Sequence, residues 1–179
     1  TSSTEFDPVS ITDNCAVAGF FNNYDFSQSL NGEDFPKGST FVVWSASDAA
    51  GNVATCEIEI IVNDDEPPVN IYCPLDVVLP NIAGNCNNDV AWLRPTENSL
   101  TDNCDFSSDL TITEDISDIG VQQAINNNNP YDQIALSLPQ TSFPVGVTTI
   151  VYTATDLSNN SSTCFFTVTI LDIEAPTVT

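Results

Sequence analysis

Hydrophobic and polar residues alternate along two segments of the chain, at positions 56–62 and 164–170. Apolar side chains occupy every even position of both segments, whereas Glu and Thr hold most of the odd positions. This period of two predicts half-buried β-strands. A second alternating segment precedes each of them, at 40–48 and 149–156. The residues between the paired segments, DAAGN and DLSNN, favour tight turns, so each pair predicts a β-hairpin.

Shorter segments of the same kind occur between stretches rich in Pro, Asn and Gly. They predict strands at Val69–Cys73, Asp76–Leu79, Asp89–Trp92, Leu110–Glu114 and Ile134–Leu138. A short helix is expected around Ile119–Ile125 alone, before four consecutive Asn and a Pro. Short strands, frequent turn residues and little helix predict an all-β chain of immunoglobulin-like β-sandwiches.

The two hairpins belong to a longer internal repeat. Residues 35–68 align with residues 143–176 without a gap, at a constant offset of 108 positions. The tetrapeptide TDNC also occurs twice, at Thr12–Cys15 and Thr101–Cys104. Its offset is only 89, so the second copy carries about 19 extra residues before its hairpin. A register held over this length indicates one module used in tandem.

The two copies differ at their front. The second opens with a Cys-Pro segment and a strand, and nothing similar precedes the first TDNC. We therefore expect residues 1–65 to form a sandwich that lacks its N-terminal strands and residues 66–174 to form a complete one. The second sandwich carries an insertion at about 115–134, and residues 175–179 begin a further repeat. One interpretation is a piece of a longer array, and the alternative is a boundary without structural meaning.

The charge of the chain limits its partners. Its 25 acidic residues face only Lys37 and Arg94, with no His, which gives a net charge of −23. Binding to nucleic acid needs clustered Lys and Arg, so nucleic acid is excluded as a partner, and anionic membrane surfaces are disfavoured for the same reason. The 41% of hydrophobic residues still suffices for a core. We expect an extracellular or cell-surface protein, where salt and divalent cations screen the self-repulsion.

Six cysteines, an even number, are typical of an oxidising compartment. Cys15 and Cys56 recur as Cys104 and Cys164, whereas Cys73 and Cys86 occur only in the second copy. If each module is self-contained, the expected disulfides are Cys15–Cys56, Cys104–Cys164 and Cys73–Cys86. Metal thiolates are the alternative, and zinc sites usually show close Cys-x-x-Cys or Cys/His pairs, which this chain lacks. Disulfides are therefore favoured.

Several motifs in this order resemble the HYR domain, or hyalin repeat. They are PP-x-x-x-x-CP, V-x-W, TDNC, FPVG and TC-x-F-x-V-x-I-x-D-x-E-A-P, and they extend from Asp13 to Pro176. The resemblance implies immunoglobulin-like or fibronectin-III-like sandwiches, in tandem arrays on secreted and cell-surface adhesive proteins. Two departures are the absent front of the first copy and SNN at 158–160, where the family usually has SGN. The second is mild, because Asn also tolerates the left-handed conformation.

No catalytic arrangement is predicted. The chain has no His for a triad or a general base, and its cysteines are expected to be paired. A glycosidase-like pair of carboxylates remains open by number, yet the acids lie in turns and linkers of a repeated sandwich. We therefore predict that the chain is not an enzyme.

Calcium is the favoured chemical hypothesis, because it takes six to eight oxygen ligands from flexible acidic loops. The acidic linkers NDDEPP and LDIEAP lie next to stiff prolines, and the turn residues Asp48 and Asn52 or a TDNC loop can approach such a junction. The candidate ligands are Asp64, Asp65, Glu66, Asp102, Asp105, Asp172 and Glu174. Ordinary solvated linkers are the alternative, since no EF-hand spacing is present.

Asn159 and Asn160 each begin an N-x-S sequon on a predicted hairpin turn, so they are candidate glycosylation sites. The sequence as a whole predicts a stalk, filament or spacer of a long extracellular adhesin, whose partners are neighbouring repeats. Two alternatives stay open. One is a module that binds a glycan or surface protein through its loops or the insertion, and the other is an accessory domain of a secreted enzyme.

Overall fold

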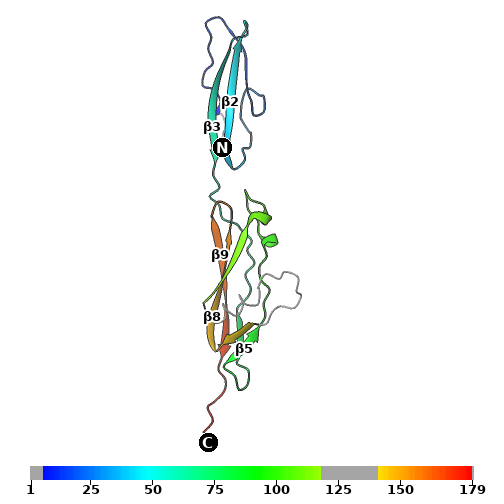
Figure 1. Cartoon of the computed structure of the whole chain (residues 1–179), viewed down its shortest axis with the longest axis vertical. Coiled ribbons are helices and arrows are strands. Elements are labelled where there is room, and N and C mark those ends of the chain that lie inside the picture. Colours follow the sequence, from blue (N-terminus) through cyan, green and yellow to red (C-terminus); the bar gives the residue numbers. More distant parts are fainter. Residues whose placement is uncertain (1–5, 118–140, 179) are drawn as a thin grey trace. The chain divides into compact units, whose positions relative to one another are not determined.

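The computed structural model describes residues 6–117 and 141–178, and the chain divides into two units, Thr1–Asp64 and Asp65–Thr179 (Figure 1). Both units consist of β-strands joined by turns, so the all-β prediction is confirmed. The predicted helix at Ile119–Ile125 and the predicted strand at Ile134–Leu138 lie outside the described residues.

The first unit contains an antiparallel sheet of three strands, β1 (Val17–Asn22), β2 (Gly38–Asp48) and β3 (Val53–Val62), in the order β1-β2-β3. The alternating segments of the sequence form the hairpin β2–β3. The sheet buries a small core, and aromatic residues pack around it. The buried core residues are Leu30, Val42, Trp44 and Ile60.

The second unit has a sheet in the order β4-β9-β8-β6. Its strands are β4 (Val77–Pro80), β6 (Thr111–Ile116), β8 (Gly146–Thr155) and β9 (Ser161–Leu171). The hairpin β8–β9 forms its centre (Figure 1), and β4 lies parallel to β9 on the outer side of the hairpin.

A two-stranded sheet completes the sandwich of the second unit. It pairs β5 (Asn87–Val90) with β7 (Thr141–Pro144), which the sequence did not predict as a strand. Two short 3₁₀ turns, η2 (Glu97–Ser99) and η3 (Ser107–Asp109), precede β6. Both sheets contribute to one core, whose buried members are Val90, Trp92, Ile116, Phe143, Ile150, Tyr152, Phe166, Val168 and Ile170.

A polar network lies inside this apolar core. The indole Nε1 of Trp92 donates a hydrogen bond to the Tyr152 hydroxyl at 2.6 Å, and that hydroxyl donates to Glu114 at 2.7 Å. Arg94 donates to the same carboxylate at 2.8 Å and stacks over the Trp92 ring. Burial, together with the negative charge of Glu114, raises the pKa of Tyr152. Each of the four side chains in this network therefore has a polar partner.

Strand positions agree with the sequence in part. The predictions at Asp76–Leu79, Asp89–Trp92 and Leu110–Glu114 correspond to β4, β5 and β6, with limits shifted by one or two residues. The prediction at Val69–Cys73 is wrong in extent, because only Val69 makes a bridge there, to Thr101.

The disulfide of the structure joins Cys73 to Cys164, with Cα atoms 5.8 Å apart. The expected pairings Cys104–Cys164 and Cys73–Cys86 are therefore wrong. The physical reason is the parallel pairing of β4 with β9, which brings the segment before β4 alongside the start of β9. Cys104 precedes β6 instead, and β8 separates β6 from β9 in the sheet.

The expected pairing of Cys15 with Cys56 is also wrong, since the structure leaves both residues exposed and unbonded. The same sheet geometry explains it. Cys15 lies just before β1, Cys56 lies in β3, and β2 runs between these two strands. Cys86 is likewise exposed and unbonded.

Candidate metal centre

The TDNC loop of the second unit holds the first carboxylate of the candidate site. Asp102 Oδ1 accepts hydrogen bonds from the backbone N–H groups of Cys104 and Asp105, both at 2.9 Å. This local capping closes a tight turn, which is why Asp favours such a position. The other oxygen, Oδ2, is buried and accepts no hydrogen bond within the described part of the chain.

The turn between β8 and β9 holds a second carboxylate, that of Asp156. One of its oxygens accepts from the Asn160 backbone N–H and the other from the Asn160 side-chain amide, both at 2.8 Å. Asp156 is only 6% exposed, so this carboxylate is fixed in a largely dry position.

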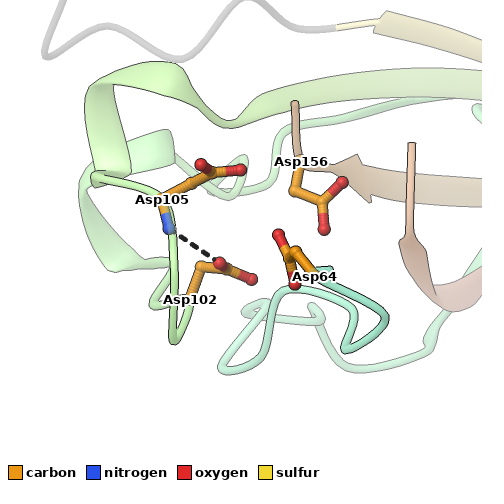
Figure 2. A group of neighbouring side chains, drawn as sticks. All are labelled: Asp64, Asp102, Asp105 and Asp156. Atoms are coloured by element: carbon orange, nitrogen blue, oxygen red, sulfur yellow. Dashed lines mark hydrogen bonds between the residues drawn. The ribbon is translucent and has the colours of Figure 1, made fainter. Parts of the chain in front are cut away.

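Asp105 connects the two loops. Its Oδ2 accepts a hydrogen bond from the backbone N–H of Leu157, at 3.0 Å, across the gap between the TDNC loop and the β8–β9 turn. Carboxylate oxygens of Asp102, Asp105 and Asp156 lie within 4.8 Å of one another. Figure 2 shows the carboxylates of Asp102, Asp105 and Asp156, which come from two loops of the second unit, facing a common space.

The charge of this group is not balanced from within its own unit. The one basic residue of the second unit is Arg94, and its guanidinium pairs with Glu114. Like charges at this spacing repel each other, and the repulsion is strongest where burial excludes water. We refer to Asp102, Asp105 and Asp156 as the aspartate triad. Its oxygens are hard ligands of the kind that Ca²⁺ prefers.

The remaining predicted ligands have different surroundings. Asp65 and Glu66 are exposed. Asp172 accepts a hydrogen bond from the backbone N–H of Glu174, and the Glu174 carboxylate accepts two from the backbone N–H of Gly84. The structure thus gives Asp172 and Glu174 a role in the turn after β9, apart from the aspartate triad.

Sequence analysis did not name Asp156 as a ligand. The available signal was the repeat itself, because Asp48 and Asp156 occupy the same position and each is followed four residues later by Asn. The sequence makes Asp48 a candidate turn ligand, and its counterpart in the second copy, Asp156, is the residue that joins the triad.

The same loops recur in the first unit with one difference. Asp13 accepts from the backbone N–H groups of Cys15 and Ala16, as Asp102 does in its own loop. Hydrogen bonds from Asn52 lower the pKa of Asp48 below its usual value. Ala16 stands where the second unit has Asp105, so the first unit has two of the three carboxylates.

The two candidate glycosylation sites differ in access. Asn159 is exposed and has a positive φ of 69°, and its counterpart Gly51 has a φ of 87°. The turn therefore needs a left-handed residue, which Asn supplies in place of Gly. The Asn160 amide donates to Asp156, so glycosylation there would cost this hydrogen bond.

Fold and loops together define an immunoglobulin-like all-β module. The family model of the HYR domain matches residues 1–62 and 132–170. The chain therefore belongs to the HYR domain family, and the resemblance expected from its motifs is confirmed. This is a family of extracellular, adhesion-related and non-enzymatic modules.

Similar proteins were found by sequence and by structure. The chain is 32% identical to hyalin of Lytechinus variegatus over 151 residues, which is 82% of this chain and 23% of that protein. It is 29% identical to sushi, von Willebrand factor type A, EGF and pentraxin domain-containing protein 1 of Rattus norvegicus, over 73% of this chain and 3% of that protein. A solved structure of protocadherin gamma B2 extracellular cadherin domains 1–5 matches with a TM-score of 0.38 and 17% identity, over 88% of this chain and 33% of that one.

The chain thus spans about a quarter or less of the curated relatives it matches. Among the described residues, no helix is long and apolar enough to cross a membrane.

Proposed function

We propose that this chain is a structural segment, a stalk or spacer, of an extracellular surface protein, and that calcium bound by the aspartate triad stabilises it. Membership of the HYR family supports the first half of the proposal. The observation that carries the second half is the buried Oδ2 of Asp102, which accepts no hydrogen bond within the described residues and lies among carboxylates. A buried charged oxygen without a donor costs free energy unless a cation neutralises it.

The chemistry of the triad favours calcium over other common metals. All three ligands are carboxylates, which suit hard cations, whereas zinc favours Cys and His. The ligands come from two loops and are held by backbone hydrogen bonds, and Ca²⁺ accepts such irregular oxygen sets more readily than Mg²⁺ does. Backbone carbonyls or water would complete the six to eight ligands.

The acidic linker is the natural source of a further ligand. Asp65 and Glu66 belong to the same unit as the triad and precede two prolines, and we infer that one of these carboxylates joins the triad when calcium binds. In that event the cation would stiffen the linker as well as the loops, which is what a stalk requires. Neighbouring repeats of such a chain would then be its principal partners.

Calcium titration of the full chain tests the proposal. After treatment with EDTA, isothermal titration should show binding at the triad, and calcium should raise the melting temperature. Asp102→Asn should abolish most of this response. The matched control is Asp89→Asn on β5, which makes the same charge change at an exposed position. Equal responses of both variants, or no response of the wild type, would refute the calcium site.

Small-angle scattering tests the role as a spacer. Calcium should narrow the distribution of overall dimensions of the wild-type chain, and Asp65→Asn should weaken this effect while leaving calcium bound at the triad. If calcium binds but the scattering profile is the same with and without it, the ion stabilises one module and does not stiffen a stalk.

A further inference from the structure

The sheet β4-β9-β8-β6 of the second unit has an outward face that is almost without charge. Side chains alternate along β8 and β9 between buried and accessible, so every second residue points away from the core. Among the described residues of the four strands, Asp115 at the end of β6 is the one charged side chain that points outward. Most outward residues of β8 and β9 are threonines, namely Thr149, Thr153, Thr155, Thr163, Thr167 and Thr169.

The same face of the first unit is acidic. The counterparts of Phe165 and Thr167 in the repeat are Glu57 and Glu59, which lie on β3 and are exposed. Phe165 is itself 68% exposed, and it lies beside the outward Val151 of β8. An exposed aromatic side chain within an uncharged patch is typical of an interaction surface. The second unit thus has an apolar centre where the first unit has solvated carboxylates.

Several hydroxyls of this face already have acceptors within the second unit. Thr111 Oγ1 donates to the carbonyl of Thr155 at 3.4 Å, and Thr113 Oγ1 donates to the carbonyl of Thr153 at 3.5 Å. The hydroxyl of Thr167 donates to the Asp76 carboxylate at 3.0 Å. Burial of a hydroxyl is costly when it leaves the group without a partner. These side chains can therefore bury their methyl groups against a partner and keep their hydrogen bonds.

The pattern of this face is self-complementary. Val151 and Phe165 form a cross-strand pair, and a pair of threonines lies on each side of it. These two threonine pairs are Thr149–Thr167 and Thr153–Thr163. A two-fold axis that runs parallel to the strands, midway between β8 and β9, exchanges the members of every pair. A second copy laid on this face by that axis places Phe165 on the copy of Val151 and threonine on threonine, as an isologous contact requires.

The charge of the chain favours a second copy at this face over any other of its surfaces. Each copy carries a net charge of −23, so acidic surfaces of two copies repel each other. The outward face avoids this repulsion, and the same two-fold axis puts the two Asp115 carboxylates at opposite edges of the contact. Charge and symmetry therefore point to the same partner.

The size of the face sets the strength of such a contact. The four strands contain 4, 11, 10 and 6 residues. With a rise of about 3.3 Å and a strand spacing of about 4.8 Å, they make a face of roughly 500 Å². Two copies then bury roughly 1,000 Å², which is the lower limit of a specific interface. The contact is accordingly weak and reversible.

We propose that the outward face of the sheet β4-β9-β8-β6 is a homotypic contact, on which the same face of a second copy of this chain packs sheet on sheet. The two sheets lie about 10 Å apart, with Phe165 and Val151 at the centre. This contact uses neither the aspartate triad nor calcium. It goes beyond the role of a spacer, because it joins two chains side by side.

Sedimentation equilibrium of the full chain tests the proposal. The buffer contains EDTA, so the outcome does not depend on the calcium site, and the exposed thiols are first alkylated, so no disulfide joins two copies. Between about 1 μM and about 1 mM, the wild type should pass from monomer towards dimer. Phe165→Glu restores the charge of the first unit and should raise the dissociation constant about tenfold or more.

The matched control is Phe106→Glu, the same change at a residue that is 80% exposed and lies outside this sheet. This variant should associate as the wild type does. A wild type that stays monomeric at every concentration would overturn the proposal and leave the face to a partner of another kind. Equal weakening by both variants would also overturn it, because net charge alone would then explain the effect.

A second variant and a map of the contact make the test independent of the folding of one mutant. Val147 is 66% exposed on β8, and Val147→Glu should weaken association several-fold. In the wild type, amide chemical shifts of β8 and β9 should change with concentration, whereas those of β5 should not. Concentration-dependent shifts on another surface would assign the dimer elsewhere and contradict the proposal.

The dependence on salt separates this contact from one between opposite charges. Raising the salt concentration from about 50 mM to about 500 mM screens the repulsion between the two copies. The dimer should therefore become several-fold tighter, as sedimentation measures it. A dimer that dissociates as salt is added would indicate an interface made by ion pairs and would rule out the uncharged face.

Discussion

The hairpin β2–β3 of the first unit and the hairpin β8–β9 of the second pair their residues in the same register. Gly38 faces Val62 in one, and the corresponding Gly146 faces Ile170 in the other. Their surroundings differ, because the second hairpin is enclosed by a second sheet and the first is covered only in part within the described residues. The local sequence therefore suffices to set a hairpin and its register, whereas burial depends on segments far away in the chain.

The turns of the two hairpins are alike down to single atoms. Each begins with an Asp whose two oxygens accept from the backbone and the side chain of the Asn four residues later. The TDNC loops that precede β1 and β6 are also alike, except that one has Ala16 and the other Asp105. One residue difference therefore explains why the loops of the first unit carry two carboxylates and those of the second unit carry three.

We expect the two units to differ most in how much stability they lose when one corresponding core residue is truncated to Ala. Phe166 is 1% exposed and packs against Trp92 and Tyr152, so Phe166→Ala should destabilise the second unit by about 3–5 kcal/mol. The counterpart Ile58 is half-buried, and Ile58→Ala should cost the first unit roughly half as much or less. Hydrogen exchange resolved by mass spectrometry reports each unit separately. Equal losses of stability in the two variants would show that Ile58 and Phe166 are equally buried, and would contradict the comparison.

The second-largest difference is expected from removal of the disulfide, because only the second unit has one among the described residues. The Cys73–Cys164 bond spans 91 positions of sequence, and loops of this size are worth roughly 4–5 kcal/mol in the chain-entropy model. Cys73→Ser should lower the free energy of unfolding of the second unit by up to about this amount. Cys56→Ser should leave the free energy of unfolding of the first unit unchanged. Peptide mapping of the wild type provides the control, and a bond from Cys164 to Cys104 would contradict the assignment.

Exchanging Ala and Asp between the two TDNC loops tests whether the third carboxylate is needed for calcium binding. Calcium at a hundredfold excess over Kd stabilises a folded state by about 2.7 kcal/mol. Asp105→Ala, which gives the second unit the loop of the first, should remove most of this stabilisation. Ala16→Asp should add a second calcium equivalent in titration, since Asp13 and Asp48 are already placed by the same hydrogen bonds. A wild-type response in both variants would contradict the comparison.

The smallest expected effect is a pH dependence specific to the second unit. The pKa of Tyr152 is raised in the folded state by burial and by Glu114, from an ordinary value of 10.0. The folded state holds this proton more tightly than the unfolded state does. The stability from this shift is therefore complete below pH 10 and declines as the pH rises above 10. Tyr152→Phe should flatten that decline in denaturant titrations, and an unchanged slope would assign it to other groups.

Prediction from sequence succeeded where the signal was local. The hairpins followed from alternation, and the left-handed conformation that Asn tolerates at position 159 followed from the comparison of SNN with the SGN usual in the HYR family. β7 was missed because TSFP shows no alternation, and it becomes a strand by pairing with β5. Asp156 was overlooked as a ligand because its neighbour Asp105 lies about fifty positions earlier in the chain.

The sequence by itself determined the repeat, the all-β class, the hairpin registers and the acidic loops, because each depends on residues within a few positions of one another. Only the tertiary structure decided the partner of Cys164, the closure of the core and the meeting of the three carboxylates. These depend on which strands become neighbours in a sheet. That choice is made by the burial of whole faces, and a short stretch of sequence does not contain it.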